Sequence, residues 1–240
     1  MGGTKMDTEL EGMLDRADEL FGDLEDEYKK CLQLQNVTAR AKNLTHEVLE
    51  KLRHSLDHTM YIIWEKHIAP TLSEQKRKRA RIYFPITNKL SGFHSLLGRG
   101  KMSDLDKVNK NLYEFLLSKQ PFSTAENRWL AILSENAASG KHVHLTPQKR
   151  IETRRIKVSR EGSSVSWNPD SVRFRGGVSV VGAPIDPSTQ RIIPTPGVTE
   201  QIEIWVSFIL TDCGVNSLVF CKEACQKVRS LIEEMFNVFN

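Results

Sequence analysis

The sequence predicts an α+β chain in which a helical bundle precedes a small antiparallel β-sheet and a C-terminal helix. Apolar residues recur at three- and four-residue spacing through most of residues 8–136, as they do in amphipathic helices. After Gly140, glycine, proline and short alternating β-branched runs take over, which is typical of strands joined by turns. We expect a first unit over residues 1–145 and a second over residues 146–240, whose final helix packs back on the bundle.

Two long helices are expected first. The first carries an apolar stripe from Leu10 to Leu32, with acidic residues on its opposite face. The second carries a stripe from Val48 to Ile63 and ends near Pro70, because the residue before a proline is pushed out of the helical region.

A basic connector follows and leads into a short extended segment, residues 82–86. A glycine-rich loop with Gly92, Gly98 and Gly100 then precedes a third helix over about residues 103–119 and a fourth over about 126–136, on either side of Pro121.

The second unit begins with strand-like runs such as RRIKVSR, SSVSW and QIEIWVSFIL. Turns are expected between them at Asn168-Pro169 and Asp186-Pro187. The closing helix, about residues 217–237, carries an apolar stripe of its own.

Composition restricts the possible classes of protein. The 240 residues are 39% hydrophobic and 27% charged, as in ordinary globular proteins. No apolar run approaches the roughly 20 residues that a membrane-spanning helix needs, and the first twelve residues lack the apolar core of a secretory signal. Four unevenly spaced cysteines do not make a disulfide framework, so we expect a cytoplasmic protein without a membrane partner.

Charge is segregated along the chain. Residues 1–30 hold ten acidic residues against four basic ones, whereas residues 71–100 hold seven basic residues against Glu74 alone. Residues 141–160 are similarly basic, with seven basic residues against Glu152. Such regions attract polyanions, although solvated helix faces and loops have the same composition. The expected contacts to a nucleic-acid backbone are Lys76, Arg77, Lys78, Arg79 and Arg81.

The second helix has a polar face opposite its apolar stripe. Helical geometry places five chemically versatile side chains on this face: Arg53, His54, Asp57, His58 and Tyr61. An arginine can neutralise phosphate charge, and histidine exchanges protons near neutral pH. The same residues also fit a simple structural interpretation, in which Arg53 and Asp57 form an intrahelical ion pair and His58 packs between helices.

Arg53 and His58 form an R-x4-H motif with a polar residue directly after the arginine. This motif on a helix resembles the signature of HEPN-domain ribonucleases, which are helical bundles. The resemblance implies that Arg53 holds phosphate and that His58 acts as the acid/base while the ribose 2′-hydroxyl attacks, leaving a 2′,3′-cyclic phosphate without a metal or other cofactor. His54, Asp57 and Tyr61 would orient these groups. A homodimer is also implied, because HEPN sites are usually completed by a second copy.

A second resemblance covers residues 45 to about 146. The segments LEKLRHSLDHTMY, YFPIT, KQPFSTAENRWLAIL and GKHVHL are similar to segments that recur, in the same order, in a group of uncharacterised bacterial and phage proteins. The resemblance implies a shared fold and brings Asp57, His58, Lys141 and His142 together in space.

Lys141, His142 and His144 form a compact basic cluster after the fourth helix. Near the second helix, they would extend an anion-binding pocket or, with the histidines and Asp57 of that helix, supply ligands for a transition metal. An exposed turn explains them equally well.

The HEPN resemblance therefore implies a metal-independent endoribonuclease that acts on RNA, of a toxin or phage-defence type with a partner protein or antitoxin. The alternative is a non-enzymatic interaction module that binds a partner protein or an acidic ligand, and a His/Asp metal-dependent hydrolase is a third hypothesis. A nuclease requires Arg53 and His58 to be exposed in a groove, whereas a binding module allows them to be buried or paired internally.

Overall fold

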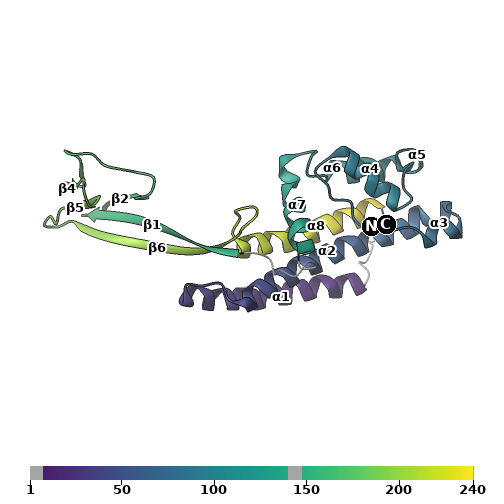
Figure 1. The fold of residues 1–240 in the computed structure, drawn as a ribbon, viewed down its shortest axis with the longest axis horizontal. Helices are drawn as coiled ribbons and strands as arrows, with labels where there is room; N and C mark the ends of the chain where they lie inside the picture. The colour runs from purple at the N-terminus through teal and green to yellow at the C-terminus, as the bar shows by residue number, and fades with distance from the viewer. Residues whose placement is uncertain (1–7, 140–147, 240) are drawn as a thin grey trace. The chain divides into compact units, whose positions relative to one another are not determined.

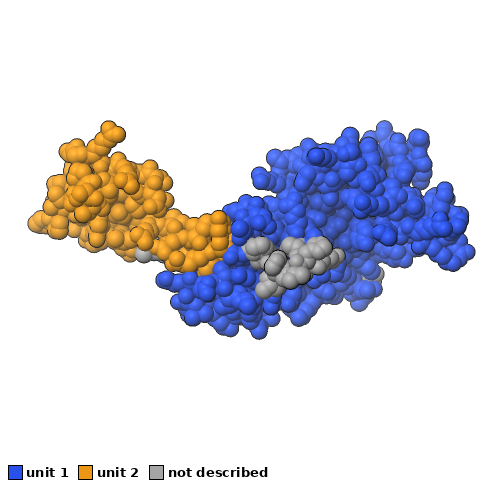
Figure 2. All heavy atoms as spheres, viewed as in Figure 1, with its two compact units in different colours: residues 1–148, 210–240 blue, residues 149–209 orange. Residues whose placement is uncertain are grey.

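A computed structural model describes residues 8–139 and 148–239 and confirms the α+β class, with helices first, an antiparallel sheet next and a helix at the end (Figure 1). The chain divides into two compact units. The helical unit comprises residues 1–148 and 210–240, and the strand unit comprises residues 149–209 (Figure 2). The closing helix thus belongs to the helical unit.

Helices α1 (Thr8–Leu34) and α2 (Ala39–His67) form an antiparallel pair (Figure 1). The junction between them is fixed by Thr38, whose hydroxyl accepts from Ala41 N at 3.0 Å as the N-cap of α2. The same hydroxyl donates to the carboxylate of Glu27 at 2.7 Å. Glu27 is thereby buried at the end of an otherwise exposed acidic face.

Helix α8 (Ser217–Phe239) packs against both α1 and α2, and α7 (Arg128–Ser139) packs against α2. Each buries the apolar stripe that its sequence predicts. The fully buried side chains at the centre of the unit include Leu14, Leu49, Leu52, Leu56, Met60, Val228, Ile232 and Met235. Burying each of these large apolar side chains stabilises the fold by about 2 kcal/mol. None of the described helices is both long and apolar enough to cross a membrane.

Short helices link α2 to α7, and here the sequence interpretation was partly wrong. The basic connector contains a helical turn, α3 (Glu74–Lys78), which follows the 3-10 turn η1 (Ala69–Thr71). The expected glycine-rich loop is largely helix α4 (Leu90–Arg99), because its apolar residues still follow helical spacing. Gly92 is required by close packing, since a Cβ there would lie 2.3 Å from Thr87 Oγ1.

The expected third helix is two helices, α5 (Leu105–Val108) and α6 (Lys110–Ser118). Asn109 separates them: its side chain accepts from Leu112 N at 3.1 Å and starts α6 as an N-cap. The fourth expected helix is preceded by a 3-10 turn, η2 (Ala125–Asn127).

The strand unit contains two three-stranded antiparallel sheets. The first has the order β2 (Ser163–Trp167), β1 (Gln148–Arg160), β6 (Thr199–Leu210), with Ile156 opposite Trp167. The second has the order β3 (Ser179–Val180), β4 (Ala183–Asp186), β5 (Arg191–Ile192).

Two-residue turns with positive φ at both positions close two of these hairpins. They are Glu161-Gly162, with φ of 47° and 83°, and Val181-Gly182, with φ of 51° and 82°. Such turns match the right-handed twist of the strands that they join. A small core of Ile156, Val158, Trp167, Val180 and Ile185 lies between the strands.

Candidate functional site

The polar face of α2 holds a neighbouring segment of backbone through Arg53 and Asp57. Arg53 Nη2 lies 3.0 Å from Asp57 Oδ1 and donates to the carbonyl oxygen of Phe84 at 2.8 Å. Asp57 Oδ1 in turn accepts from Phe84 N at 2.8 Å. One ion pair therefore binds both backbone polar groups of Phe84. We call Arg53 and Asp57 the clamp.

The clamp is mostly shielded from solvent. The exposed fractions of the Arg53 and Asp57 side chains are 17% and 19%. Burial lowers the pKa of the Arg53 guanidinium, and the carboxylate of Asp57 opposes that shift. Arginine nevertheless keeps its charge at physiological pH. Arg53 Nη1 is buried and has no hydrogen-bond partner among the described residues.

Gln120 holds the backbone that follows Phe84, residues 85–87. Its amide nitrogen donates to the carbonyl oxygens of Pro85 and Leu116, each at 2.8 Å, and its amide oxygen accepts from Thr87 N at 3.2 Å. The side chain is completely buried. The segments LRHSLDH, YFPIT and QPF, which the sequence resemblance singled out, thus meet through hydrogen bonds to the backbone of residues 84–87.

The side chains of the segment that leads to Phe84 alternate between solvent and core. Arg79, Arg81 and Tyr83 are exposed, whereas Ala80 and Ile82 are half-buried and Phe84 is fully buried. From Arg81 onward such alternation is the pattern of an extended chain. Arg79 itself is the C-cap of α3, with φ of −98° and ψ of −3°. Arg81 N also donates to the carbonyl oxygen of Arg99 at 2.9 Å, so residues 81–84 are held at both ends. We call residues 79–83 the strip.

The strip belongs to a larger basic surface made of α3, the strip and the end of α4. It contains Lys76, Arg77, Lys78, Arg79, Arg81, Arg99 and Lys101. Lys78 pairs with Glu74 at 2.6 Å, and Arg77 Nε donates to Leu72 O at 3.1 Å. In the described part of the chain, no carboxylate is within ion-pair distance of Arg79, Arg81, Arg99 or Lys101, so this cationic surface is available to an external anion.

A small cleft of about 190 Å³ lies beside the strip. Arg53, His54, Asp57 and Tyr83 contribute to its wall, together with Glu50 and three residues of α7. His54 is exposed, so the cleft places an accessible imidazole near the clamp.

The remaining predicted site residues lie in different surroundings. His58 is partly exposed on α2 and is not among the residues that form this cleft. Tyr61 is 46% exposed, stacks on Trp64 with 6.3 Å between ring centroids, and donates to Glu65, which raises the pKa of its phenol. Lys141, His142 and His144 lie outside the described residues.

Within the described ranges, no three His, Cys, Asp or Glu side chains are grouped as they would be to hold a metal ion. His142 and His144, on which part of the metal hypothesis depends, are not in those ranges.

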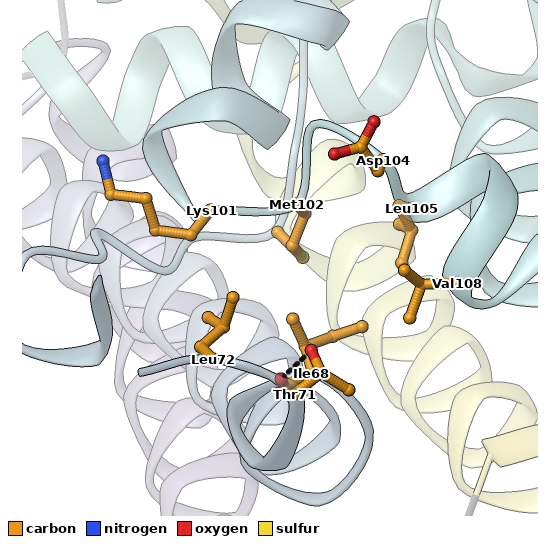
Figure 3. A pocket seen from close by; sticks show the side chains of 8 residues that line it. All are labelled: Ile68, Thr71, Leu72, Lys101, Met102, Asp104, Leu105 and Val108. Atoms are coloured by element: carbon orange, nitrogen blue, oxygen red, sulfur yellow. Dashed lines mark hydrogen bonds between the residues drawn. The ribbon is translucent and has the colours of Figure 1, made fainter. Parts of the chain in front are cut away.

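A second hollow, of about 240 Å³, lies between η1 and the chain that joins α4 to α5 (Figure 3). Its wall is mixed: Leu72, Met102, Leu105 and Val108 contribute apolar surface, and Thr71, Lys101 and Asp104 contribute polar surface. Lys101 has a φ of 59°, in the left-handed region that a residue with a Cβ adopts at some cost. The hollow therefore offers polar as well as apolar contacts.

Sequence reasoning missed Gln120 and Tyr83 as site residues. Their signal was present in the segments QPF and YFPIT, but a resemblance without an assigned role does not say which residue of a segment acts. Comparisons with protein-family models, with curated proteins and with solved structures found no match to this chain.

Proposed function

We propose that the helical unit is a non-enzymatic binding module whose basic surface takes up an acidic ligand. The observation that carries the proposal is the group of four cations, Arg79, Arg81, Arg99 and Lys101, that have no carboxylate within reach in the described part of the chain. Residues 66–101 contain nine basic residues and a single acidic one, Glu74. A field of one sign over a surface concentrates anions and speeds their association.

The clamp supports a binding module rather than a nuclease. Arg53 Nη2 is used by Asp57 and by the backbone of Phe84, and the side chain is largely buried. An arginine that stabilises a phosphorane must turn its donors towards the substrate. In this proposal Arg53 and Asp57 are therefore scaffold residues that hold the strip at the surface.

Ribonuclease activity is the second candidate function. The cleft supports it, because Arg53 and the exposed imidazole of His54 both contribute to its wall next to the basic surface. Cleavage by the HEPN-like route would also require His58 and a second copy of the chain.

The binding test uses a base-free polyanion, a polyphosphate of defined length, and two matched double variants. Lys76→Ala/Lys78→Ala removes two lysines of the basic surface, of which Lys78 is paired with Glu74. Lys29→Ala/Lys222→Ala removes two exposed helical lysines elsewhere, of which Lys29 is paired with Asp26 at 2.8 Å. Net charge changes equally in both variants.

We expect the wild-type affinity for polyphosphate to fall steeply with salt, and the slope of log K against log salt to shrink by about one for each basic-surface lysine removed. The control variant should behave as the wild type. Equal losses in both variants, or binding that is insensitive to salt, would contradict the proposal. Incubation of RNA in EDTA adds a check: 2′,3′-cyclic phosphate ends that disappear in His58→Ala would favour the ribonuclease instead.

A further inference from the structure

The strip combines exposed cations with an exposed aromatic ring. Tyr83 is 52% exposed, although its neighbour Phe84 is fully buried. The alternation from Arg81 onward therefore directs Tyr83 to the same side as Arg81, while Arg79 is exposed at the end of α3 just before them. Its ring also forms part of the cleft wall beside Arg53 and His54, so a flat group placed on the ring would reach polar groups at its edge.

From this arrangement we infer that the acidic ligand of the basic surface is a single-stranded nucleic acid, with one base stacked on Tyr83 and the adjoining phosphates bound by Arg81 and Arg79. The inference rests on the proposed function and names its ligand. Cationic grooves with exposed aromatic side chains are the usual platform for single strands, because every unpaired base offers a π-face. The bases of a duplex already stack on one another and cannot reach the ring.

The spacing along the strip fits a stacked strand. Alternate residues of an extended chain lie about 6.6 Å apart. Nucleotides in a stacked strand rise by about 3.4 Å each, so a nucleotide and the second one after it lie about 6.8 Å apart along the strand. Arg81 and Tyr83, which are alternate residues of the extended part of the strip, can therefore follow one strand in register.

The strip is also held in place before any ligand binds. Arg81 N is bonded to Arg99 O, and both backbone polar groups of Phe84 are bonded to the clamp. Binding then requires little ordering of the protein backbone, which favours affinity. The guanidinium groups add planar donors that match phosphate oxygens better than ammonium groups do.

An acidic protein is the competing ligand for the same surface. It would use the hollow beside Lys101 to anchor a side chain, whereas nothing in such a ligand calls for the exposed ring of Tyr83. The exposure of Arg81 and Tyr83 on one side of the strip, with the exposed Arg79 next to them in the chain, favours the nucleic acid.

The test measures the affinity of the full chain for labelled oligo(U) and oligo(dT) of 20 nucleotides, for a 20-base-pair duplex, for polyphosphate and for poly-L-glutamate of equal charge. The variants are Tyr83→Ala, Tyr83→Phe and the control Tyr61→Ala. Tyr61 is similarly exposed on the surface, but it is stacked on Trp64 and bonded to Glu65, whose charge repels phosphate. Circular dichroism verifies that each variant is folded.

We expect Tyr83→Ala to weaken binding of the single strands about tenfold and to leave polyphosphate binding unchanged. Tyr83→Phe should keep most of the affinity because it keeps the ring, and Tyr61→Ala should have little effect. A preference of oligo(U) over oligo(dT), or the reverse, distinguishes RNA from DNA as the source of the strand.

The inference is overturned if the duplex binds as tightly as the single strands, if Tyr83→Ala and Tyr61→Ala have the same effect, or if poly-L-glutamate binds best. The last result would point to an acidic protein. In each of these cases the proposed function still holds if polyphosphate binding depends on Lys76 and Lys78. If polyphosphate binding does not depend on these lysines, both the proposed function and the nucleic-acid inference are wrong.

Discussion

The guanidinium of Arg53 on α2 and those of Arg79 and Arg81 on the strip meet opposite surroundings. Arg53 is 17% exposed and bonded to Asp57 and Phe84. Arg79 and Arg81 are exposed, and no described carboxylate pairs with them. Arg53, which belongs to the R-x4-H motif, holds the chain together, whereas Arg79 and Arg81, which belong to no motif, face the solvent. Motif spacing therefore identifies capable side chains, but burial and partners decide what they do.

The largest expected effect comes from opening the clamp. Arg53→Ala or Asp57→Ala leaves the other charge and the backbone groups of Phe84 without a partner. We expect each variant to lower the free energy of unfolding by about 3 kcal/mol, measured by urea denaturation. His54→Ala, next to Arg53 but exposed, serves as the control and should change stability by less than about 0.5 kcal/mol. If Arg53→Ala lowers the free energy of unfolding no more than His54→Ala does, the structural role of the clamp is wrong. That result would favour the catalytic interpretation of Arg53.

A somewhat smaller effect is expected from Gln120, which holds the segment from its far end. Gln120→Ala loses three hydrogen bonds, each worth about 1 kcal/mol or less, and should lower stability by about 2 kcal/mol. Gln75→Ala, on the exposed turn α3, is the matched control with little expected effect.

Gln120 also tests whether the segment behaves as one unit. In a double-mutant cycle, Gln120→Ala with Asp57→Ala should be less destabilising than the sum of the two single changes, since either change already releases part of residues 84–87. Strict additivity would show that the two ends are held independently.

The smallest effect concerns the acidic residues of α1, where the same contrast between bonded and exposed groups recurs. Glu27 is buried, and its hydrogen bond from Thr38 lowers the pKa of its carboxyl. A lowered folded-state pKa stabilises the protein above the ordinary glutamate pKa, and this contribution is lost as the pH falls through the folded value. Thr38→Ala should therefore cost about 1 kcal/mol at pH 7 and less at pH 3, where the loss of the N-cap remains.

The control for this prediction is Asp26→Asn, which breaks an exposed pair with Lys29 on the same helix. Urea denaturation at pH 7 and pH 3 should show a change below about 0.5 kcal/mol for that variant. A pH-independent cost of Thr38→Ala would mean that Glu27 takes no part and that capping alone accounts for it.

The sequence was sufficient for the fold class and for the elements with strong periodicity. The stripes of α1, α2 and α8 follow helical spacing over six or more turns, so local pattern and tertiary packing agree. Prediction was weakest between residues 73 and 119. There glycine in α4 suggested a loop, although its apolar stripe and the tight contact of Gly92 with Thr87 favour a helix, and Asn109 divides an apolar pattern that reads as continuous.

For the candidate site, the sequence by itself determined which side chains share the polar face of α2 and where positive charge gathers, because both follow from spacing and composition. Tertiary structure alone decided that Arg53 and Asp57 form hydrogen bonds with the backbone of Phe84 and that Gln120 binds the backbone next to it. It also decided that Tyr83 remains exposed beside two arginines. These contacts join residues about 30 positions apart. Their partners are backbone groups, which every residue possesses, so no sequence pattern marks them in advance.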